Sequence, residues 1–287
     1  MKKVLVTGAM GQLGKSLQRI SLAYTDLEFL WTDVDQMDIT NQQDVLSVFR
    51  DFDPDFCINC AAYTQVDLAE QEPEKARLIN VDAVGNLIEA CNEKQCTLFH
   101  ISTDFVFDGK SDTPYTESSK PNPLSIYGRT KLEGEEKVFN HAKQFIIFRT
   151  SWVFSEFGKN FVKTMLHLSE THSELQVVDD QTGSPTYAGD LARHILDIML
   201  SGKPENETYH FCNQGATTWC DFAKAIFTLT GKKLEVIPIA SEDFGAAAVR
   251  PAYSVLDCSK IQKALGAQIR PWLQGLEDCL QRLQSIY

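Results

Sequence analysis

Short apolar runs alternate with amphipathic helical stretches along the first 150 residues, and no other feature constrains the fold as strongly. The apolar runs occupy residues 4–7, 27–31, 56–61, 97–102 and 145–150. Helical spacing of apolar residues fills the intervals at 12–23, 42–52, 73–94 and 127–140. Strands that alternate with helices pair in parallel through right-handed crossovers, which places helices on both faces of the sheet. The sequence therefore predicts an α/β fold, a doubly wound parallel sheet of the Rossmann type, with ligands at the carboxyl ends of its strands.

The alternation loosens after about residue 153. Segments rich in Gly, Pro, Asp and Thr, at 179–190 and 238–254, separate further helical stretches. This pattern predicts a smaller C-terminal α/β cap that builds the substrate cleft. We expect a dinucleotide-binding domain formed by residues 1–153 plus about 187–213, and a substrate-binding domain formed by about 154–186 and 214–287.

The net charge of the chain is −12 at pH 7, which limits its partners. A surface this acidic argues against nucleic acid or an anionic membrane, while backbone amides and a few arginines can still hold an anionic small ligand. The apolar run that follows Lys3 stops at Thr7, short of the ~7–15 residues of a signal-peptide core. No stretch approaches the ~20 apolar residues of a membrane span, so we expect a cytoplasmic protein.

The eight cysteines are scattered, and Cys57 and Cys60 form the only Cys-x-x-Cys pair. Residues three apart on a strand point to opposite faces, so this pair cannot easily share a metal or close a disulfide. The six histidines show no ligand spacing either. The sequence predicts reduced core thiols and no bound metal.

A glycine-rich loop joins the first predicted strand to the first predicted helix, with the spacing Gly-x-x-Gly-x-x-Gly. Glycine is needed at the sharp turn, where the backbone must touch a pyrophosphate, and where helix and strand pack closely. The helix N-terminus then faces the anion. Away from such a strand–helix junction, the same triplet would indicate no more than a glycine-rich turn. The dinucleotide contacts predicted here are Gly8, Met10, Gly11, Gln12, Leu13 and Gly14.

Asp33 ends the second predicted strand, close to the ~20 residues after the loop where a ribose-binding carboxylate is expected. Such a carboxylate favours NADH, whereas an adjacent arginine would favour the 2′-phosphate of NADPH. No Arg or Lys is adjacent, although Thr32 can hydrogen-bond a phosphate, so we predict NADH with NADPH tolerated. Asp38 and Ile39 are candidates for the adenine pocket, with a helix-capping turn as the alternative.

Three residues form a candidate catalytic set. Thr103 ends a predicted strand, and Tyr127 and Lys131 lie four residues apart at the start of the next helix, on one face. A lysine cation near a tyrosine stabilises the phenolate, so we expect Lys131 to lower the pKa of Tyr127 enough for proton transfer near pH 7. Thr103 would hydrogen-bond the reacting oxygen and hold a carbonyl against Tyr127. Tyr127 and Lys131 also count among the predicted cofactor contacts.

The glycine spacing, the strand-end Ser-Thr and the Tyr-x-x-x-Lys pair resemble the extended short-chain dehydrogenase/reductase family. More specific segments, in order along nearly the whole chain, resemble the dTDP-4-dehydrorhamnose reductase family within it. These segments are 11–14, 59–67, 102–109, 149–153, 180–186 and 250–251.

The resemblance implies NAD(P)H-dependent reduction of dTDP-4-dehydro-L-rhamnose to dTDP-L-rhamnose, with hydride delivered to C4 and Tyr127 as proton donor. It implies that the backbone of Ala61, Ala62 and Tyr63 borders the cofactor. A guanidinium suits a diphosphate and an indole offers a flat wall for a sugar or base, with a surface Arg and a core Trp as the alternatives. The substrate contacts implied are Asp104, Phe105, Val106, Trp152, Asn160, Gln181 and Arg250.

Two departures from the family pattern matter. Relatives often carry a carboxylate early in the first helix that takes part in a metal-linked dimer contact, but Lys15 and Ser16 stand there in this chain. The metal and that dimer contact are therefore not carried over to this chain, and a homodimer is left open. Phe105 stands where a tyrosine is common, so one substrate hydrogen bond is lost.

Other activities on the same fold are less well supported. A sugar-nucleotide dehydratase needs a second carboxylate after the catalytic threonine and Asp104, and Phe105 stands there. A nucleotide-sugar 4-epimerase usually has a larger cap. A non-catalytic NADP-binding regulatory subunit has no need of the intact set of Thr103, Tyr127 and Lys131. The epimerase and the regulatory subunit remain the alternatives.

Overall fold

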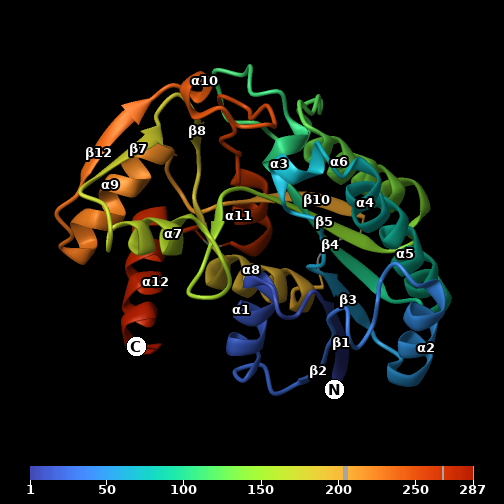
Figure 1. The fold of residues 1–287 in the computed structure, drawn as a ribbon. Coiled ribbons are helices and arrows are strands. Elements are labelled where there is room, and N and C mark those ends of the chain that lie inside the picture. The colour runs from blue at the N-terminus through green and yellow to red at the C-terminus, as the bar shows by residue number, and fades with distance from the viewer. Residues whose placement is uncertain (203–205, 267, 287) are drawn as a thin grey trace.

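The computed structural model describes residues 1–202, 206–266 and 268–286, and its centre is a sheet of six parallel strands (Figure 1). In spatial order the strands are β2 (Leu27–Trp31), β1 (Lys2–Thr7), β3 (Phe56–Asn59), β4 (Thr97–Thr103), β5 (Phe145–Thr150) and β10 (Glu207–Phe211). The order reverses between β1 and β3, and ligands of doubly wound sheets bind at such a point. The predicted fold class is confirmed.

Successive side chains of β1 enter two different buried layers, which is why the strand is apolar throughout. Val4 and Val6 pack with Leu17 and Leu191 on one face of the sheet, and Leu5 packs on the other. Burial of each such side chain contributes roughly 1.5–3 kcal/mol to folding. The first face is covered by α1 (Gln12–Ser21), α8 (Ala188–Leu200) and α11 (Ser259–Leu265), and the second by α2 (Gln42–Phe52), α5 (Ala83–Lys94) and α6 (Ile126–His141).

The helix predicted over 73–94 is interrupted. It consists of α4 (Pro73–Arg77), one π-helical turn (Leu78–Asp82) and α5. Asn80 in the π turn is buried, and its side chain bonds both backbone groups of Tyr63 and the hydroxyl of Thr130. A side chain committed to such internal hydrogen bonds displaces the regular helical pattern locally.

The strand predicted over 56–61 ends at Asn59. Beyond it, Cys60 and Ala61 leave the ladder and pass directly beside Gly8, and the Ala61 amide donates to the Thr7 hydroxyl (3.3 Å). The chain therefore turns away from the sheet where it meets the glycine loop. A short helix, α3 (Val66–Ala69), follows, and a single 3-10 turn (Asp104–Val106) follows β4.

The smaller lobe is built on a parallel pair, β7 with β12, and on two short pairs. Phe222 and Ile226 pack against Leu276 and Val162 in its separate core. Figure 1 shows this lobe beside the carboxyl edge of the large sheet. Its elements are β6 (Val153–Phe154), α7 (Phe161–Leu168), β7 (Glu174–Val178), β8 (Thr182–Gly183), β9 (Thr186–Tyr187), β11 (Thr217–Thr218), α9 (Trp219–Thr230), β12 (Glu235–Ile239), α10 (Ser241–Phe244) and α12 (Trp272–Ile286).

The chain crosses between the lobes more than once. After the first part of the cap, α8 and β10 return to the large sheet, and β10 pairs with β5 in parallel. The chain then enters the cap again at β11. Residues 203–205, 267 and 287 of the two predicted domains lie outside the described residues.

All eight cysteines are free thiols, as predicted, and Cys57 is buried in the helix-covered core while Cys60 is half-buried at the cleft. Among the described helices, none has the length and apolar character needed to cross a membrane.

Candidate active site

The glycine loop turns tightly where β1 ends and α1 begins. Gly8 has φ of +61°, and a Cβ atom there would lie 2.7 Å from the Ala61 nitrogen. A Cβ on Gly14 would lie 2.5 Å from the carbonyl oxygen of Gly8. Only glycine meets both requirements, and the result is a helix N-terminus whose first-turn amides face the carboxyl edge of the sheet.

Asp33 lies across from this loop. Its Oδ2 atom accepts a hydrogen bond from the Met10 amide (2.9 Å), and its Oδ1 atom from the Val34 amide (2.9 Å). The Asp38 carboxylate accepts from the backbone and hydroxyl of Thr40. A glycine cradle that no side chain could occupy, together with a carboxylate at the second strand, fits a nicotinamide dinucleotide.

Replacing Asp33 with alanine is expected to move cofactor preference towards NADPH by about tenfold, because a carboxylate repels the 2′-phosphate. The ratio of kcat/KM for NADPH to that for NADH measures the change. Asp35, an exposed carboxylate on the same loop, provides the control through Asp35→Ala. An unchanged ratio in Asp33→Ala would remove Asp33 from the ribose site.

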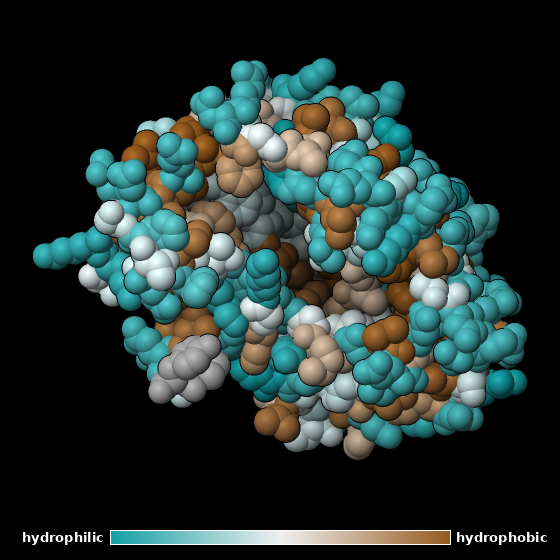
Figure 2. All heavy atoms as spheres, in the orientation of Figure 1, coloured by the Kyte–Doolittle hydropathy of each residue, from teal (hydrophilic) through white to brown (hydrophobic). Residues whose placement is uncertain are grey.

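A cavity of about 920 Å³ runs along the carboxyl edge of the sheet, and Figure 2 shows its mouth as the hollow between the lobes. It is lined by most of the predicted cofactor residues, namely Gly8, Met10, Gly11, Gln12, Leu13, Asp33, Asp38, Ile39, Ala61, Ala62, Tyr127 and Lys131. It is also lined by Thr103, Asp104, Phe105, Trp152, Asn160 and Arg250. A second, apolar cavity of about 360 Å³ shares Phe105, Trp152 and Arg250 with the first and adds Gln181.

Three predicted site residues lie outside both linings. Gly14 acts through the close packing of α1 on the loop. The Tyr63 hydroxyl donates to Glu72 (2.8 Å), away from the cavity, and its backbone bonds Asn80. Val106, the last residue of the 3-10 turn, is fully buried in the core.

The three candidate catalytic residues converge from two elements. Thr103 ends β4, and Tyr127 and Lys131 lie one turn apart near the start of α6. Lys131 is 2 % exposed, and its Nζ atom donates to the carbonyl oxygen of Ile101 (2.7 Å). The Thr103 hydroxyl donates to Asp104 (3.0 Å) and lies within hydrogen-bonding reach of Tyr127.

Burial controls the protonation of this site. It raises the pKa of Tyr127 to about 12, against a smaller lowering by Thr103, and Asp104 raises it further. Burial also lowers the pKa of Lys131 to about 8 and raises the pKa of Asp104 to about 6. The expected pKa of Tyr127 near neutrality is therefore wrong for this structure, because desolvation of the phenol dominates and the net shift is upward.

The helix that carries Tyr127 is capped twice at its N-terminus. The Ser125 hydroxyl accepts from the Gly128 amide (3.1 Å), as an ordinary N-cap does. The Glu70 carboxylate, at the end of α3, accepts from the Ile126 amide (2.7 Å). Glu70 could not be predicted from the sequence, since nothing in its local pattern indicates a partner 56 residues away.

One part of the cleft wall is a stack of two indoles. Trp152, with φ of +47°, stacks on Trp219 with ring centroids 3.5 Å apart and planes 7° from parallel. A Cβ on Gly183 would lie 2.5 Å from the Trp152 ring, so only glycine fits behind it. Trp219 also donates to Gln181 (3.1 Å). A strained backbone held by such packing is typical of functional positions, and Trp219 is a site residue that the sequence alone did not indicate.

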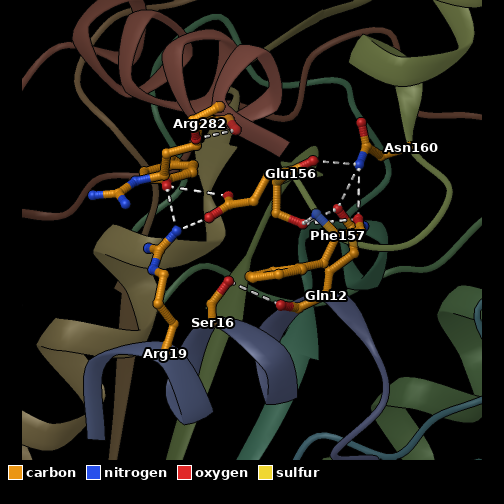
Figure 3. Close-up of polar contacts among 10 residues, drawn as sticks. Gln12, Ser16, Arg19, Glu156, Phe157, Asn160 and Arg282 are labelled. Atoms are coloured by element: carbon orange, nitrogen blue, oxygen red, sulfur yellow. Dashed lines mark hydrogen bonds and ion pairs between the residues drawn. The ribbon is translucent and has the colours of Figure 1, made fainter. Parts of the chain in front are cut away.

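A hydrogen-bond network ties the glycine loop to the cap (Figure 3). The Gln12 Oε1 atom accepts from Ser155 (2.9 Å) and from the side-chain amide of Asn160 (3.0 Å). Asn160 caps α7 and donates to two backbone carbonyls as well. Close by, buried Glu156 forms an ion pair with Arg19 of α1. These contacts fix the cap loop on the helix that follows the phosphate-binding turn.

The fold, the glycine cradle and the converging Thr103, Tyr127 and Lys131 define an extended short-chain dehydrogenase/reductase. A family model described as the RmlD substrate binding domain matches residues 1–285. A dTDP-4-dehydrorhamnose reductase of Aggregatibacter actinomycetemcomitans is 41% identical, with 97% of this chain and 98% of that protein covered. The chain therefore belongs to the dTDP-4-dehydrorhamnose reductase family.

Two further comparisons agree. The spore coat polysaccharide biosynthesis protein SpsK of Bacillus subtilis (strain 168) is 42% identical, with 99% of each chain covered. The crystal structure of dTDP-4-dehydrorhamnose reductase from Bacillus anthracis, in complex with NADP, is similar with a TM-score of 0.93. It is 40% identical and covers 98% of this chain and 100% of that chain.

Proposed function

We propose that this protein reduces dTDP-4-dehydro-L-rhamnose to dTDP-L-rhamnose with NADPH or NADH. The observation that carries the proposal is one continuous cleft, which runs from the glycine loop past Tyr127 to Trp152 and Arg250. The names of the relatives and the NADP-bound neighbour support this substrate class and cofactor.

The dinucleotide would be held by the amides around Gly11 and by Asp33, with Ala61 and Ala62 beside it. When bound, its reduced nicotinamide supplies the hydride for C4. All other steps are carried out by side chains of the protein. The Thr103 hydroxyl, which donates to Asp104 in this structure, turns to the carbonyl oxygen and holds it against Tyr127.

Tyr127 then gives its phenolic proton to the C4 oxygen, so that the ketone becomes an alcohol and the tyrosine a phenolate. An alkoxide is a stronger base than a phenolate, so a donor with a pKa near 12 still transfers its proton downhill. Buried Lys131, one helical turn away, stabilises the phenolate that remains. Solvent restores the proton before the next turnover.

The substrate is proposed to fill the cap side of the cleft. Trp152 packs against the sugar, and Phe105, Asp104 and Asn160 border it. Arg250 meets the diphosphate, because a planar guanidinium binds phosphate oxygens in pairs. Gln181 belongs to the adjoining apolar cavity, where the nucleoside fits.

The test is loss of reduced-nicotinamide absorbance when NADPH or NADH is mixed with freshly made dTDP-4-dehydro-L-rhamnose. Oxidation by wild type, absent in Tyr127→Phe, is the expected result. Interconversion of two nucleotide sugars without net oxidation would indicate a 4-epimerase instead. Cofactor binding without any turnover would indicate a regulatory subunit.

A cytoplasmic location follows from the same proposal, because the reaction uses soluble nucleotide-linked substrates and cofactors. The dTDP-sugar is the proposed partner, with neither nucleic acid nor membrane needed. A homodimer stays an open prediction.

A further inference from the structure

Asp67 lies on α3, the helix that begins with the cleft residue Val66, in a segment that resembles the family but has no role in the chemistry described above. Figure 1 shows where α3 lies in the fold. Its carboxylate spans the cleft to the loop that follows α10. Oδ1 accepts from Arg250 Nη1 (3.0 Å) and from the Ala248 amide (3.0 Å). Oδ2 accepts from Arg250 Nη2 (2.6 Å). The large lobe and the cap loop are thereby joined by a bidentate ion pair between residues 183 positions apart.

This pair occupies only one edge of the Arg250 guanidinium. Of its five N–H donors, the two on Nη1 go to Asp67 and to the Ala248 carbonyl (3.1 Å), and one on Nη2 goes to Asp67. Nε–H and the second Nη2–H lie together on the adjacent edge. Within the described part of the chain, no acceptor takes either of them. Two parallel donors on one edge form the fork that binds two oxygens of a phosphate.

Arg250 lines both cavities, at the point where they meet. A substrate whose sugar lies at Tyr127 and whose nucleoside lies in the apolar cavity must place its linking diphosphate between the two. An arginine side chain that is free in solution loses conformational freedom when it binds an anion. An arginine already held by a carboxylate has lost that freedom on folding.

We propose that Asp67 is a positioning residue, which holds Arg250 by one edge so that the other edge receives the diphosphate of a nucleotide-linked substrate. The inference rests on the proposed function for the identity of the anion. The short helix that carries Asp67 is also tied to the catalytic helix α6, because Glu70 at its end accepts a hydrogen bond from the Ile126 amide (2.7 Å). The Arg250 loop and the helix that carries Tyr127 are therefore both hydrogen-bonded to α3 and the residue at its end.

The test is calorimetric titration of dTDP into wild type, Asp67→Asn, Arg250→Ala and the double variant. Asparagine keeps the shape of aspartate but turns one oxygen into a donor that faces the guanidinium. We expect about tenfold weaker binding of dTDP in Asp67→Asn, and roughly 10–100-fold weaker binding in Arg250→Ala. The double variant should bind no more weakly than Arg250→Ala, because Asp67 does not itself contact the diphosphate and acts on its binding through Arg250.

Steady-state kinetics give a second readout. In Asp67→Asn the KM for the dTDP-sugar should rise by a similar factor, while kcat changes much less and NADPH affinity is retained. Retained NADPH affinity also shows that the variant is folded. Asp55, which pairs with Lys2 (2.7 Å) at the amino ends of the strands, provides the matched control. Asp55→Asn should bind dTDP as wild type does.

Three results would overturn the inference. One is unchanged or tighter binding of dTDP by Asp67→Asn, which would mean that Asp67 is idle or competes for Arg250. Another is a further loss in the double variant beyond that in Arg250→Ala. The third is a wild-type protein that does not bind dTDP. Binding of dTDP without turnover would instead refute the proposed reaction, and the Asp67 variants would still decide the positioning role.

Discussion

Tyr127→Phe is expected to lower kcat by roughly 10²–10⁴-fold, the usual contribution of a positioned general acid, and to leave NADPH affinity nearly unchanged. The substitution removes only the hydroxyl. The ring at position 127 keeps its edge-on contact with the Phe105 ring, and the two ring centroids lie 5.5 Å apart. Single-turnover oxidation of NADPH in the presence of the keto-sugar, with a separate titration of the cofactor, measures the two quantities.

Tyr24→Phe is the matched control for this substitution. The Tyr24 hydroxyl donates to Asp197 (3.3 Å) outside the cleft, so its removal tests the loss of a tyrosine hydrogen bond without touching the site. Wild-type turnover is expected from it. If Tyr127→Phe lost NADPH affinity as severely as turnover, its hydroxyl would be a binding group and another residue would donate the proton.

Local sequence patterns predicted most of the fold, and they also predicted the glycine loop and the catalytic pair of the site. The alternation of β1 between two buried layers, the glycines at 8 and 14, and the four-residue spacing of Tyr127 and Lys131 all follow from neighbours in the chain. Each feature has a fixed period or a steric requirement that a single sequence displays. They could be predicted for that reason.

The remainder of the site depends on residues that meet only after folding. Trp219 stacks on Trp152 from a helix 67 positions later, and the Asp67–Arg250 pair joins two lobes. No spacing rule links such residues. The helix interruption at Asn80 could not be predicted from the sequence either, because its cause is a set of tertiary hydrogen bonds to Tyr63 and Thr130.

The electrostatics of the site could not be predicted from spacing either. One helical turn between Tyr127 and Lys131 indicated a phenol acidified by an ammonium. In the folded protein Lys131 is buried and Tyr127 is half-buried in the wall of the cleft, and desolvation moves their pKa values in opposite directions, up for the phenol and down for the ammonium. Depth of burial is a property of the whole fold, and it outweighs the nearest neighbour here.

Lys131→Met is expected to reduce kcat/KM by roughly 10²–10³-fold, because the phenolate left after proton transfer loses its nearby cation. In wild type, kcat/KM should decline above about pH 8, where Lys131 loses its proton. Tyr127 remains protonated there, since its pKa is about 12. A pH profile of kcat/KM for the two proteins checks both statements, and the methionine variant should lack the decline near pH 8.

The same substitution is expected to stabilise the fold at pH 7. Burial lowers the pKa of Lys131 from 10.5 to about 8, so the folded protein holds this proton less tightly than the unfolded chain does. Below pH 8 both states are protonated, and the buried charge costs on the order of 3 kcal/mol. Between pH 8 and 10.5 the unfolded state binds more protons, so the cost fades as the pH rises. Methionine is similar in length and carries no charge.

Removing Lys131 leaves no other buried charge without a partner in its surroundings, since the neighbouring Glu135 keeps its bidentate ion pair with Arg149. Urea unfolding at pH 7 and pH 9.5 should therefore show a more stable Lys131→Met protein, with the smaller gain at the higher pH. Lys137→Met, on the same helix but paired with Asp82 near the surface (3.4 Å), should leave both stability and turnover close to wild type. A Lys131→Met protein less stable than wild type at pH 7 would mean that the bond to Ile101 outweighs desolvation. The lysine would then contribute to the stability of the fold. The expected increase in stability would instead show that its charge is retained for turnover and lowers the stability of the protein.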